Sequence, residues 1–128
     1  MSRKILVVDD DDDVRRLAVM SLTRVGGHEV RAVDSGMGCL AALADEVPDV
    51  VVLDVMMPGM DGPATLAEIR AGSRTHGVPV IFLTAGVVEA DVDRLRSLPV
   101  AGVLRKPFDP MTLPAQVANL LGWPDGPA

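Results

Sequence analysis

Short runs of β-branched and aliphatic residues alternate with helical spacings along the chain, and this alternation restricts the fold more than any other feature of the sequence. Between the runs, apolar residues recur every three or four positions, which is the period of an amphipathic helix. Strands that alternate with helices predict a parallel sheet, because parallel neighbours need a crossover connection. The five predicted strands cover residues 5–8, 30–33, 50–53, 80–83 and 100–104.

The composition of each run indicates its place in the sheet. Residues 50–53 and 80–83 are apolar throughout, as expected for central strands that are covered on both faces. Glu29 and Arg31 accompany the second run, which therefore reads as an edge strand. We expect an α/β fold in which five helices cover both faces of a five-stranded parallel sheet. The helical spacings predict helices within residues 14–25, 37–44, 66–69, 88–95 and 113–121.

The length of the chain fits one domain. It has 128 residues, 48% of them hydrophobic, which is enough for a buried core. We expect the domain to occupy residues 1–122, with a short tail over residues 123–128. Cys39 is the only cysteine, which excludes an intrachain disulfide and favours a reducing compartment. The sequence also lacks the apolar stretch of a signal peptide or membrane span, so we expect a cytoplasmic protein.

An excess of acidic residues narrows the choice of partners. Eighteen Asp and Glu against 12 Lys and Arg give a net charge of −6. Surfaces that bind nucleic acid or anionic membranes need clustered Lys and Arg, so we expect neither as a direct partner. His28 and His76 stand apart from each other and from the acidic run, and we expect them in solvated or capping positions. Trp123 is expected to pack at the end of the last helix.

Polar side chains follow four of the five predicted strands. Asp9 and Asp10 follow the first strand, Asp54 the third, and Thr84 the fourth. Lys106 comes just after the fifth strand. Ligands of parallel α/β sheets bind at the carboxyl ends of the strands, and we expect these side chains to meet there.

These residue types together suit a phosphoryl group and a metal ion. Three carboxylates at one sheet edge repel each other unless a cation joins them, and oxygen ligands with open positions favour Mg²⁺. Lys106 and the Thr84 hydroxyl can contact phosphoryl oxygens. Asp54 lies between apolar residues, so burial and a metal could tune it as a nucleophile that forms an acyl phosphate.

The five consecutive aspartates divide into two groups. Asp9 and Asp10 lie at the strand end and are the candidate ligands. Asp11, Asp12 and Asp13 are expected to cap the following helix and to complement its positive dipole end.

The Gly-Pro pair at residues 62–63 is typical of the first turn of a helix.

Four motifs in order along the chain, ILVVDD, VVLDVMMPGMDG, VIFLTA and VLRKPF, resemble the receiver domain of two-component response regulators. The resemblance covers essentially the whole chain and includes chemotaxis-regulator-like receivers that consist of one domain. It implies a flavodoxin-like, doubly wound sheet with strand order 2-1-3-4-5. Four motifs together are far more specific than any one of them.

The resemblance also implies roles for individual residues. Asp54 would be the phosphoacceptor, and Asp10, Asp54 and the Met56 carbonyl would bind Mg²⁺ directly. Asp9 would reach the metal mainly through water. Thr84 and Lys106 would contact the phosphoryl group, and the peptide bond after Lys106 would be cis.

The function that the resemblance implies is a phosphorylation-switched signalling receiver. A histidine kinase or a histidine phosphotransfer protein would supply the phosphoryl group, and a downstream target protein would respond. No enzymatic activity is expected apart from self-phosphorylation and self-dephosphorylation at Asp54. Two alternatives stay open: the chain is the receiver part of a longer response regulator with an output domain, or it is an adaptor that is not phosphorylated.

Rival functions fit the residues less well. A phosphatase or phosphotransferase acting through an aspartyl phosphate would need a second acid two residues after the nucleophile, where this chain has Met56. An FMN carrier would share the strand order, but the chain has no Tyr, one Trp, and acids where a phosphate loop would lie. A receiver that served only as an adaptor would be expected to have lost Asp54 or Lys106, and both are present.

Overall fold

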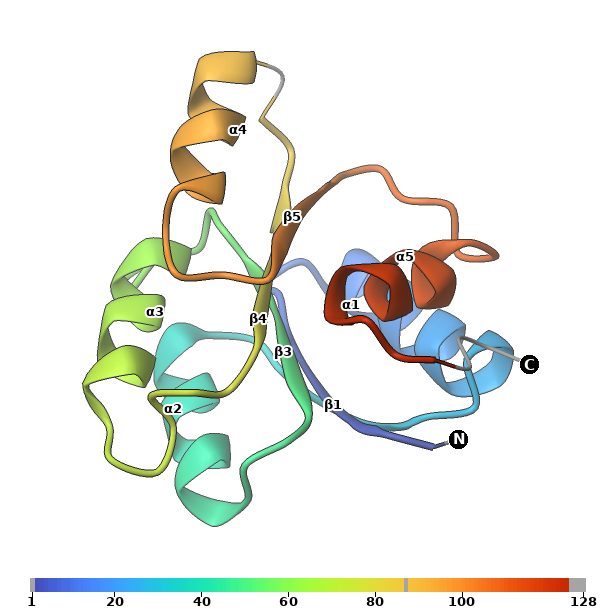
Figure 1. The fold of residues 1–128 in the computed structure, drawn as a ribbon, viewed down its shortest axis with the longest axis horizontal. Helices are drawn as coiled ribbons and strands as arrows, with labels where there is room; N and C mark the ends of the chain where they lie inside the picture. Colours follow the sequence, from blue (N-terminus) through green and yellow to red (C-terminus); the bar gives the residue numbers. More distant parts are fainter. Residues whose placement is uncertain (1, 87, 125–128) are drawn as a thin grey trace.

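The computed structural model describes residues 2–86 and 88–124 and contains the five-stranded parallel sheet that the sequence predicts (Figure 1). The strand order is β2-β1-β3-β4-β5, which confirms the flavodoxin-like fold and the edge position of the second strand. The strands are β1 (Lys4–Val8), β2 (Glu29–Val33), β3 (Val50–Asp54), β4 (Val80–Thr84) and β5 (Gly102–Arg105).

The helices cover both faces of the sheet. In Figure 1, α1 and α5 lie on one side of the strands, and α2, α3 and α4 lie on the other. No described helix has both the length and the apolar character that crossing a membrane requires. The helices are α1 (Asp12–Met20), α2 (Gly36–Asp45), α3 (Gly62–Ala71), α4 (Glu89–Arg96) and α5 (Leu113–Leu121), and a π-helical segment, η1 (Ser21–Val25), continues α1.

Alternate side chains of the central strands divide the core into two layers. Leu6 and Val8 of β1 pack with residues of α2, α3 and α4, whereas Ile5 and Val7 pack with α1 and α5. All residues of β3 and β4 are buried, since both strands have neighbours on each side and helices on each face. The ends of these strands are therefore held by packing from every direction.

Most element boundaries differ by one residue or more from the predicted ranges, and two of the differences have a clear structural cause. The fifth strand begins at Gly102 rather than at residue 100, because Val100 donates its N–H to the Leu98 carbonyl in a turn. Its apolar side chain packs against the core without belonging to the strand. The sequence predicted one helix that extends to residue 25. In the structure α1 ends at Met20, and Ser21–Val25 form the π-helical segment η1.

The acidic run caps α1 as expected. Asp11 is the N-cap residue, and its Oδ1 accepts the N–H groups of Asp13 at 2.9 Å and Val14 at 3.2 Å. Asp12 and Asp13 lie in the first turn, where negative charge complements the helix dipole. Three of the five aspartates thus stabilise the start of α1. The other two, Asp9 and Asp10, lie at the carboxyl end of β1.

Arg70, at the end of α3, connects three segments of backbone. Its Nε and Nη2 donate to the Pro99 carbonyl at 3.1 and 2.8 Å. Its Nη1 donates to the carbonyls of His76 at 3.0 Å and Val78 at 2.7 Å. One planar guanidinium therefore joins α3, the entry to β4 and the loop before β5, which a point charge on a lysine could not do.

We expect Arg70→Met to lower the free energy of unfolding by about 1–3 kcal/mol, because three carbonyls lose a charged donor. Urea unfolding monitored by far-UV circular dichroism measures this change. The control is Arg74→Met, which removes a single bond of 3.3 Å to the Ala44 carbonyl and should change stability by no more than about 0.5 kcal/mol. Equal losses in the two variants would contradict the bridging role of Arg70.

Candidate functional site

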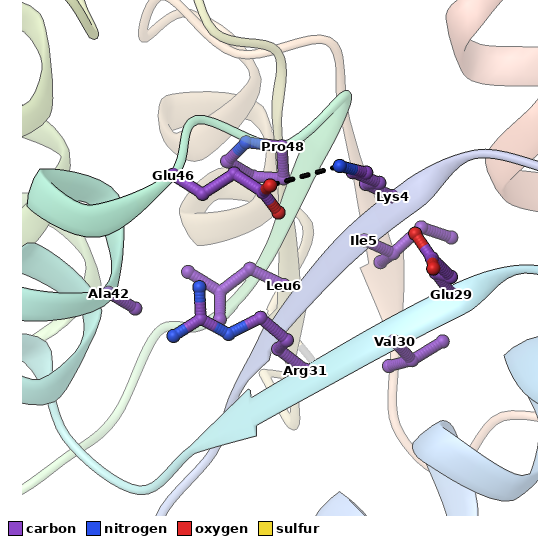
Figure 2. Close-up of a pocket in the computed structure, with 9 residues that line it drawn as sticks. All are labelled: Lys4, Ile5, Leu6, Glu29, Val30, Arg31, Ala42, Glu46 and Pro48. Atoms are coloured by element: carbon purple, nitrogen blue, oxygen red, sulfur yellow. Dashed lines mark hydrogen bonds and ion pairs between the residues drawn. The ribbon is translucent and has the colours of Figure 1, made fainter.

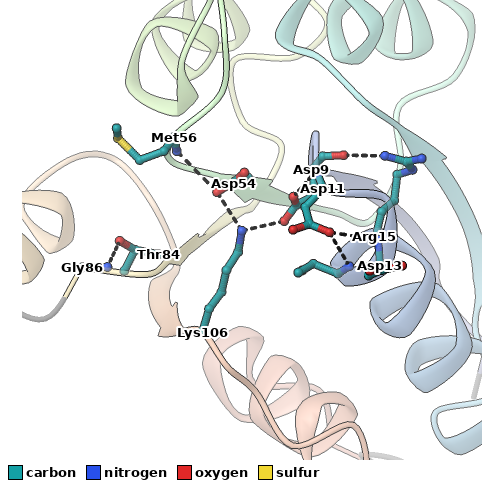
Figure 3. Close-up of polar contacts among 10 residues, drawn as sticks. Asp9, Asp11, Asp13, Arg15, Asp54, Met56, Thr84, Gly86 and Lys106 are labelled. Carbon is teal, nitrogen blue, oxygen red and sulfur yellow. Dashed lines mark hydrogen bonds and ion pairs between the residues drawn. The ribbon is translucent and has the colours of Figure 1, made fainter.

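The carboxyl ends of the strands bring four polar side chains to one edge of the sheet (Figure 3). Asp54 is the last residue of β3 and Thr84 the last of β4, while Asp9 follows β1 directly. Lys106 follows β5 and donates its backbone N–H to the Thr84 carbonyl at 2.8 Å, which continues the pairing of the two strands. Parallel pairing in register therefore places these residues side by side.

Three carboxylates form a cluster at this edge. Asp9, Asp10 and Asp54 each offer one oxygen, and the three oxygens lie within 4.8 Å of one another. Asp9 and Asp54 are buried, and Asp54 is only 3% exposed, whereas Asp10 faces solvent. The cluster is therefore open on one side and closed by the sheet on the other.

Backbone N–H groups fix the two buried carboxylates. Asp9 Oδ1 accepts the N–H of Asp11 at 2.9 Å, and Asp54 Oδ1 accepts the N–H of Met56 at 3.3 Å. The Met56 side chain itself is 74% exposed. Met56 thus contacts the site through its backbone rather than through its thioether.

Lys106 is the cation of the site. Its Nζ lies 2.8 Å from Asp9 Oδ2 and 3.1 Å from Asp54 Oδ1, and its side chain is 16% exposed. Burial lowers the pKa of the ammonium, but hydrogen bonding and attraction to Asp9 and Asp54 outweigh burial and leave its pKa above the ordinary value. The peptide bond between Lys106 and Pro107 is cis, as the sequence motif predicts.

One ammonium does not balance three carboxylates. Burial raises the pKa of Asp54 to about 6, with a further increase from the charge of Asp9, even though Lys106 acts in the opposite direction. Asp9 Oδ2 is buried, and the partner that the described part of the chain offers it is the Lys106 ammonium, which it shares with Asp54. The site therefore has unsatisfied negative charge and oxygen ligands, which suit a hard divalent cation.

The sequence matches the family described as Response regulator receiver domain over residues 5–118. The chain belongs to this family. Its acidic cluster and its fold are thus those of a receiver, and receivers are not conventional enzymes.

Longer proteins contain regions similar to this receiver. The transcriptional regulatory protein GltR of Pseudomonas aeruginosa is 40% identical over 119 residues, which cover 93% of this chain and 49% of GltR. The response regulator PleD of Caulobacter vibrioides is 38% identical over 122 residues, which cover 94% of this chain and 26% of PleD. The receiver therefore spans half or less of the length of these relatives.

Solved structures of similar length share the fold. The chemotaxis response regulator CheY4 of Vibrio cholerae superposes with a TM-score of 0.85 at 28% identity, covering 94% of this chain and 99% of CheY4. The receiver domain of DrrB activated by BeF3 gives a TM-score of 0.81 at 30% identity, with coverage of 95% and 99%. Receivers that consist of one domain are thus among the structural neighbours.

Thr84 reaches the site edge, but its hydroxyl points elsewhere. Thr84 Oγ1 accepts the N–H of Gly86 at 2.9 Å, and no hydrogen bond joins it to another of the described site residues (Figure 3). The side chain is buried. In this arrangement of the receiver, the structure brings together Asp9, Asp10, Asp54 and Lys106, with the threonine hydroxyl turned toward the loop after β4.

Arg15 supports the site and was missed by sequence reasoning. Its Nη1 donates to the Asp9 carbonyl at 2.9 Å (Figure 3). Its Nη2 pairs with Asp12 in the first turn of α1. The guanidinium therefore fixes the backbone that carries Asp9. Nothing in the sequence distinguishes Arg15 from its neighbour Arg16, because only the folded helix shows which of them faces the strand end.

Gly62 is a second supporting residue whose role the sequence does not reveal. A Cβ atom there would lie 2.6 Å from the Asp54 carbonyl oxygen and 2.8 Å from Val55 Cα, which is too close for any residue except glycine. Gly62 also donates its N–H to the Val55 carbonyl at 2.8 Å. The first residues of α3 can therefore pack directly against the end of β3, where the turn pattern predicted only a helix start.

The raised pKa of Asp54 predicts a pH-dependent stability. The folded state holds a proton on Asp54 up to about pH 6, whereas the ordinary pKa is 3.8, so the ionised carboxylate destabilises the fold most above pH 6. In EDTA at pH 7.5 we expect Asp54→Asn to raise the melting temperature by roughly 3–8 °C. This advantage should shrink as the pH falls from 6 to 4, because wild-type Asp54 then becomes protonated.

Thermal melts followed by circular dichroism at several pH values measure this difference. The control is Asp45→Asn, since Asp45 is exposed and distant from the acidic cluster. A stability gain for Asp54→Asn that is the same at pH 4.5 and 7.5 would show that ionisation of Asp54 is not its cause.

Proposed function

We propose that the chain is a signalling receiver that accepts a phosphoryl group on Asp54 in the presence of Mg²⁺. The observation that supports this most strongly is the environment of Asp54. Its carboxylate is buried beside Asp9 and is 3.1 Å from the ammonium of Lys106. Repulsion and burial raise the energy of its free ionised form. Conversion to an acyl phosphate moves the negative charge outward, toward Lys106 and solvent.

The metal site that fits the cluster consists of Asp9, Asp10 and Asp54, with the Met56 carbonyl as a further ligand. Three carboxylate oxygens that lie within 4.8 Å of one another, one of them exposed, match a cation that keeps several water ligands. When bound, Mg²⁺ supplies positive charge that reduces the repulsion between the carboxylates and an incoming phosphoryl group.

The residues of this chain would act together in the transfer. A carboxylate oxygen of Asp54 forms the new bond to phosphorus while the bond between phosphorus and the imidazole nitrogen of the donor breaks, and the imidazole leaves with the electron pair. Lys106 is close enough to pair with a phosphoryl oxygen instead of with Asp54 Oδ1. Thr84 would contribute once its hydroxyl exchanges the Gly86 N–H for a phosphoryl oxygen.

The donor in this proposal is a phosphohistidine of a histidine kinase or of a histidine phosphotransfer protein, and the output is altered binding of a downstream target protein. The receiver domain would occupy residues 1–122, with a tail at 123–128, in the cytoplasm. We propose no direct contact between these residues and nucleic acid or membrane, because the net charge is −6. The receiver could act alone or within a longer regulator such as its relatives.

We expect acetyl phosphate with Mg²⁺ to add one phosphoryl group to the protein, and Asp54→Asn to abolish the addition. Intact-mass spectrometry at neutral pH measures the adduct. Asp45→Asn serves as the control and should be labelled as fully as wild type. A phosphoryl adduct of undiminished yield on Asp54→Asn would refute the assignment of the phosphoacceptor, and a wild-type protein that is never labelled would favour the adaptor function.

Magnesium should stabilise the folded protein, because only the native state brings the three carboxylates together. We expect millimolar MgCl₂ to raise the melting temperature and Asp10→Asn to lose most of that increase. Asp10 is exposed, so its substitution should leave the protein folded. Differential scanning calorimetry with Asp13→Asn as a control tests this, since Asp13 belongs to the acidic run but not to the cluster. An unchanged response in Asp10→Asn would place the cation elsewhere.

A further inference from the structure

A cluster of ring and cationic side chains lies at the opposite end of the sheet from Asp54. Arg3 precedes β1 and His28 precedes β2, so both lie at the amino ends of the strands. Trp123 follows α5 and lies beside both of them. We call Arg3, His28 and Trp123 the terminal cluster.

His28 is buried, whereas the sequence predicted a solvated or capping position. The residue is only 6% exposed, and its ring centroid lies 5.4 Å from that of Trp123 at an interplanar angle of 59°. The Arg3 guanidinium lies over the indole ring of Trp123, with the Arg3 Cζ 5.1 Å from the ring centroid. Trp123 therefore contacts both a cation and an imidazole.

The hydrogen bond of His28 determines its protonation state. Nδ1 accepts the backbone N–H of Arg3 at 3.1 Å, so the neutral ring carries its proton on Nε2. Nε2 is buried and has no hydrogen-bond partner within residues 2–86 and 88–124. A second proton can bind only at Nδ1, where it would face the Arg3 N–H and break that bond.

The surrounding charges also oppose a second proton. Burial lowers the pKa of His28 below the ordinary 6.5, and the positive charge of Arg3 lowers it further. Asp49 is the acidic residue that acts in the opposite direction, and its Oδ2 accepts the Lys4 N–H at 2.8 Å. The lower pKa means that folding favours neutral His28, so stability from this cluster is present at neutral pH and is lost on acidification.

Trp123 lies just beyond the end of α5. Gly122 adopts a left-handed conformation, with φ of 67°, and turns the chain at the end of the helix. The backbone N–H of Trp123 donates to the Ala118 carbonyl at 3.0 Å, which belongs to the helix cap. The ring contacts Arg3 and His28 and also packs, partly buried, against the core layer on the α1 and α5 side of the sheet, so the contact with His28 is one of several that keep it docked.

We propose that His28 acts as a proton-sensitive latch that holds Trp123 against the amino ends of β1 and β2. Protonation at Nδ1 breaks the bond to the Arg3 N–H and makes His28 a cation that repels the Arg3 guanidinium, so the imidazole moves away from both Arg3 and the indole. Trp123 is then released into solvent while the sheet stays folded. The latch operates at the end of the sheet away from Asp54 and does not depend on phosphorylation.

The fluorescence of Trp123 tests the latch directly, because the chain has one Trp and no Tyr. On acidification from pH 7.5 to 5.0 we expect a red shift and stronger quenching by acrylamide, with a one-proton midpoint below 6.5 and unchanged far-UV circular dichroism. His28→Gln should abolish this transition, since an amide oxygen can accept the Arg3 N–H but does not titrate. His76→Gln is the matched control and should retain it.

Asp54 titrates in an overlapping pH range, so Asp54→Asn is included and should show the same Trp123 transition as wild type. A red shift that persists in His28→Gln, or that is absent from wild type, overturns the latch. If His28→Gln does not fold, nitrogen NMR of the wild-type imidazoles decides the question. A His28 ring that becomes protonated without a change at Trp123, or a change at Trp123 while His28 stays neutral, also overturns it.

Discussion

Repulsion among the carboxylates of Asp9, Asp10 and Asp54 is the interaction around which the site is organised. The strands that carry them cannot separate to relieve it, because β1 and β3 are hydrogen-bonded on both sides and covered on both faces. Lys106 offsets part of the charge, and the pKa of Asp54 still rises to about 6. The hydrophobic core therefore stabilises a site that is electrostatically unfavourable in isolation.

The two ends of the sheet carry different chemistry for one geometric reason. In a parallel sheet all carboxyl ends lie at one edge and all amino ends at the other. The first edge collects Asp9, Asp54 and Lys106, and the second collects His28 with the residues that flank the first strand and the last helix. Each end brings together residues that are far apart in the sequence.

Most of the fold could be predicted because its signals are local. Uniformly apolar runs identified β3 and β4, and Asp11 marked the start of α1 by a cap that acts within three residues. The errors arose where an apolar side chain packs on the core outside a strand, as Val100 does. The burial of His28 was also missed, since it depends on Trp123, which lies 95 residues further along the chain (123 − 28).

The sequence by itself determined the family, the alternation of strands and helices, and the identity of the acids, the threonine and the lysine at the strand ends. These depend on residue types at fixed spacings, which the chain carries whether or not it is folded. Tertiary structure alone decided that Arg15 supports Asp9, that Gly62 must lack a side chain, and that the Thr84 hydroxyl binds Gly86. Those relations depend on distances of a few ångströms between elements. The packing of the folded chain determines such distances, and the spacing of residues along the sequence does not encode them.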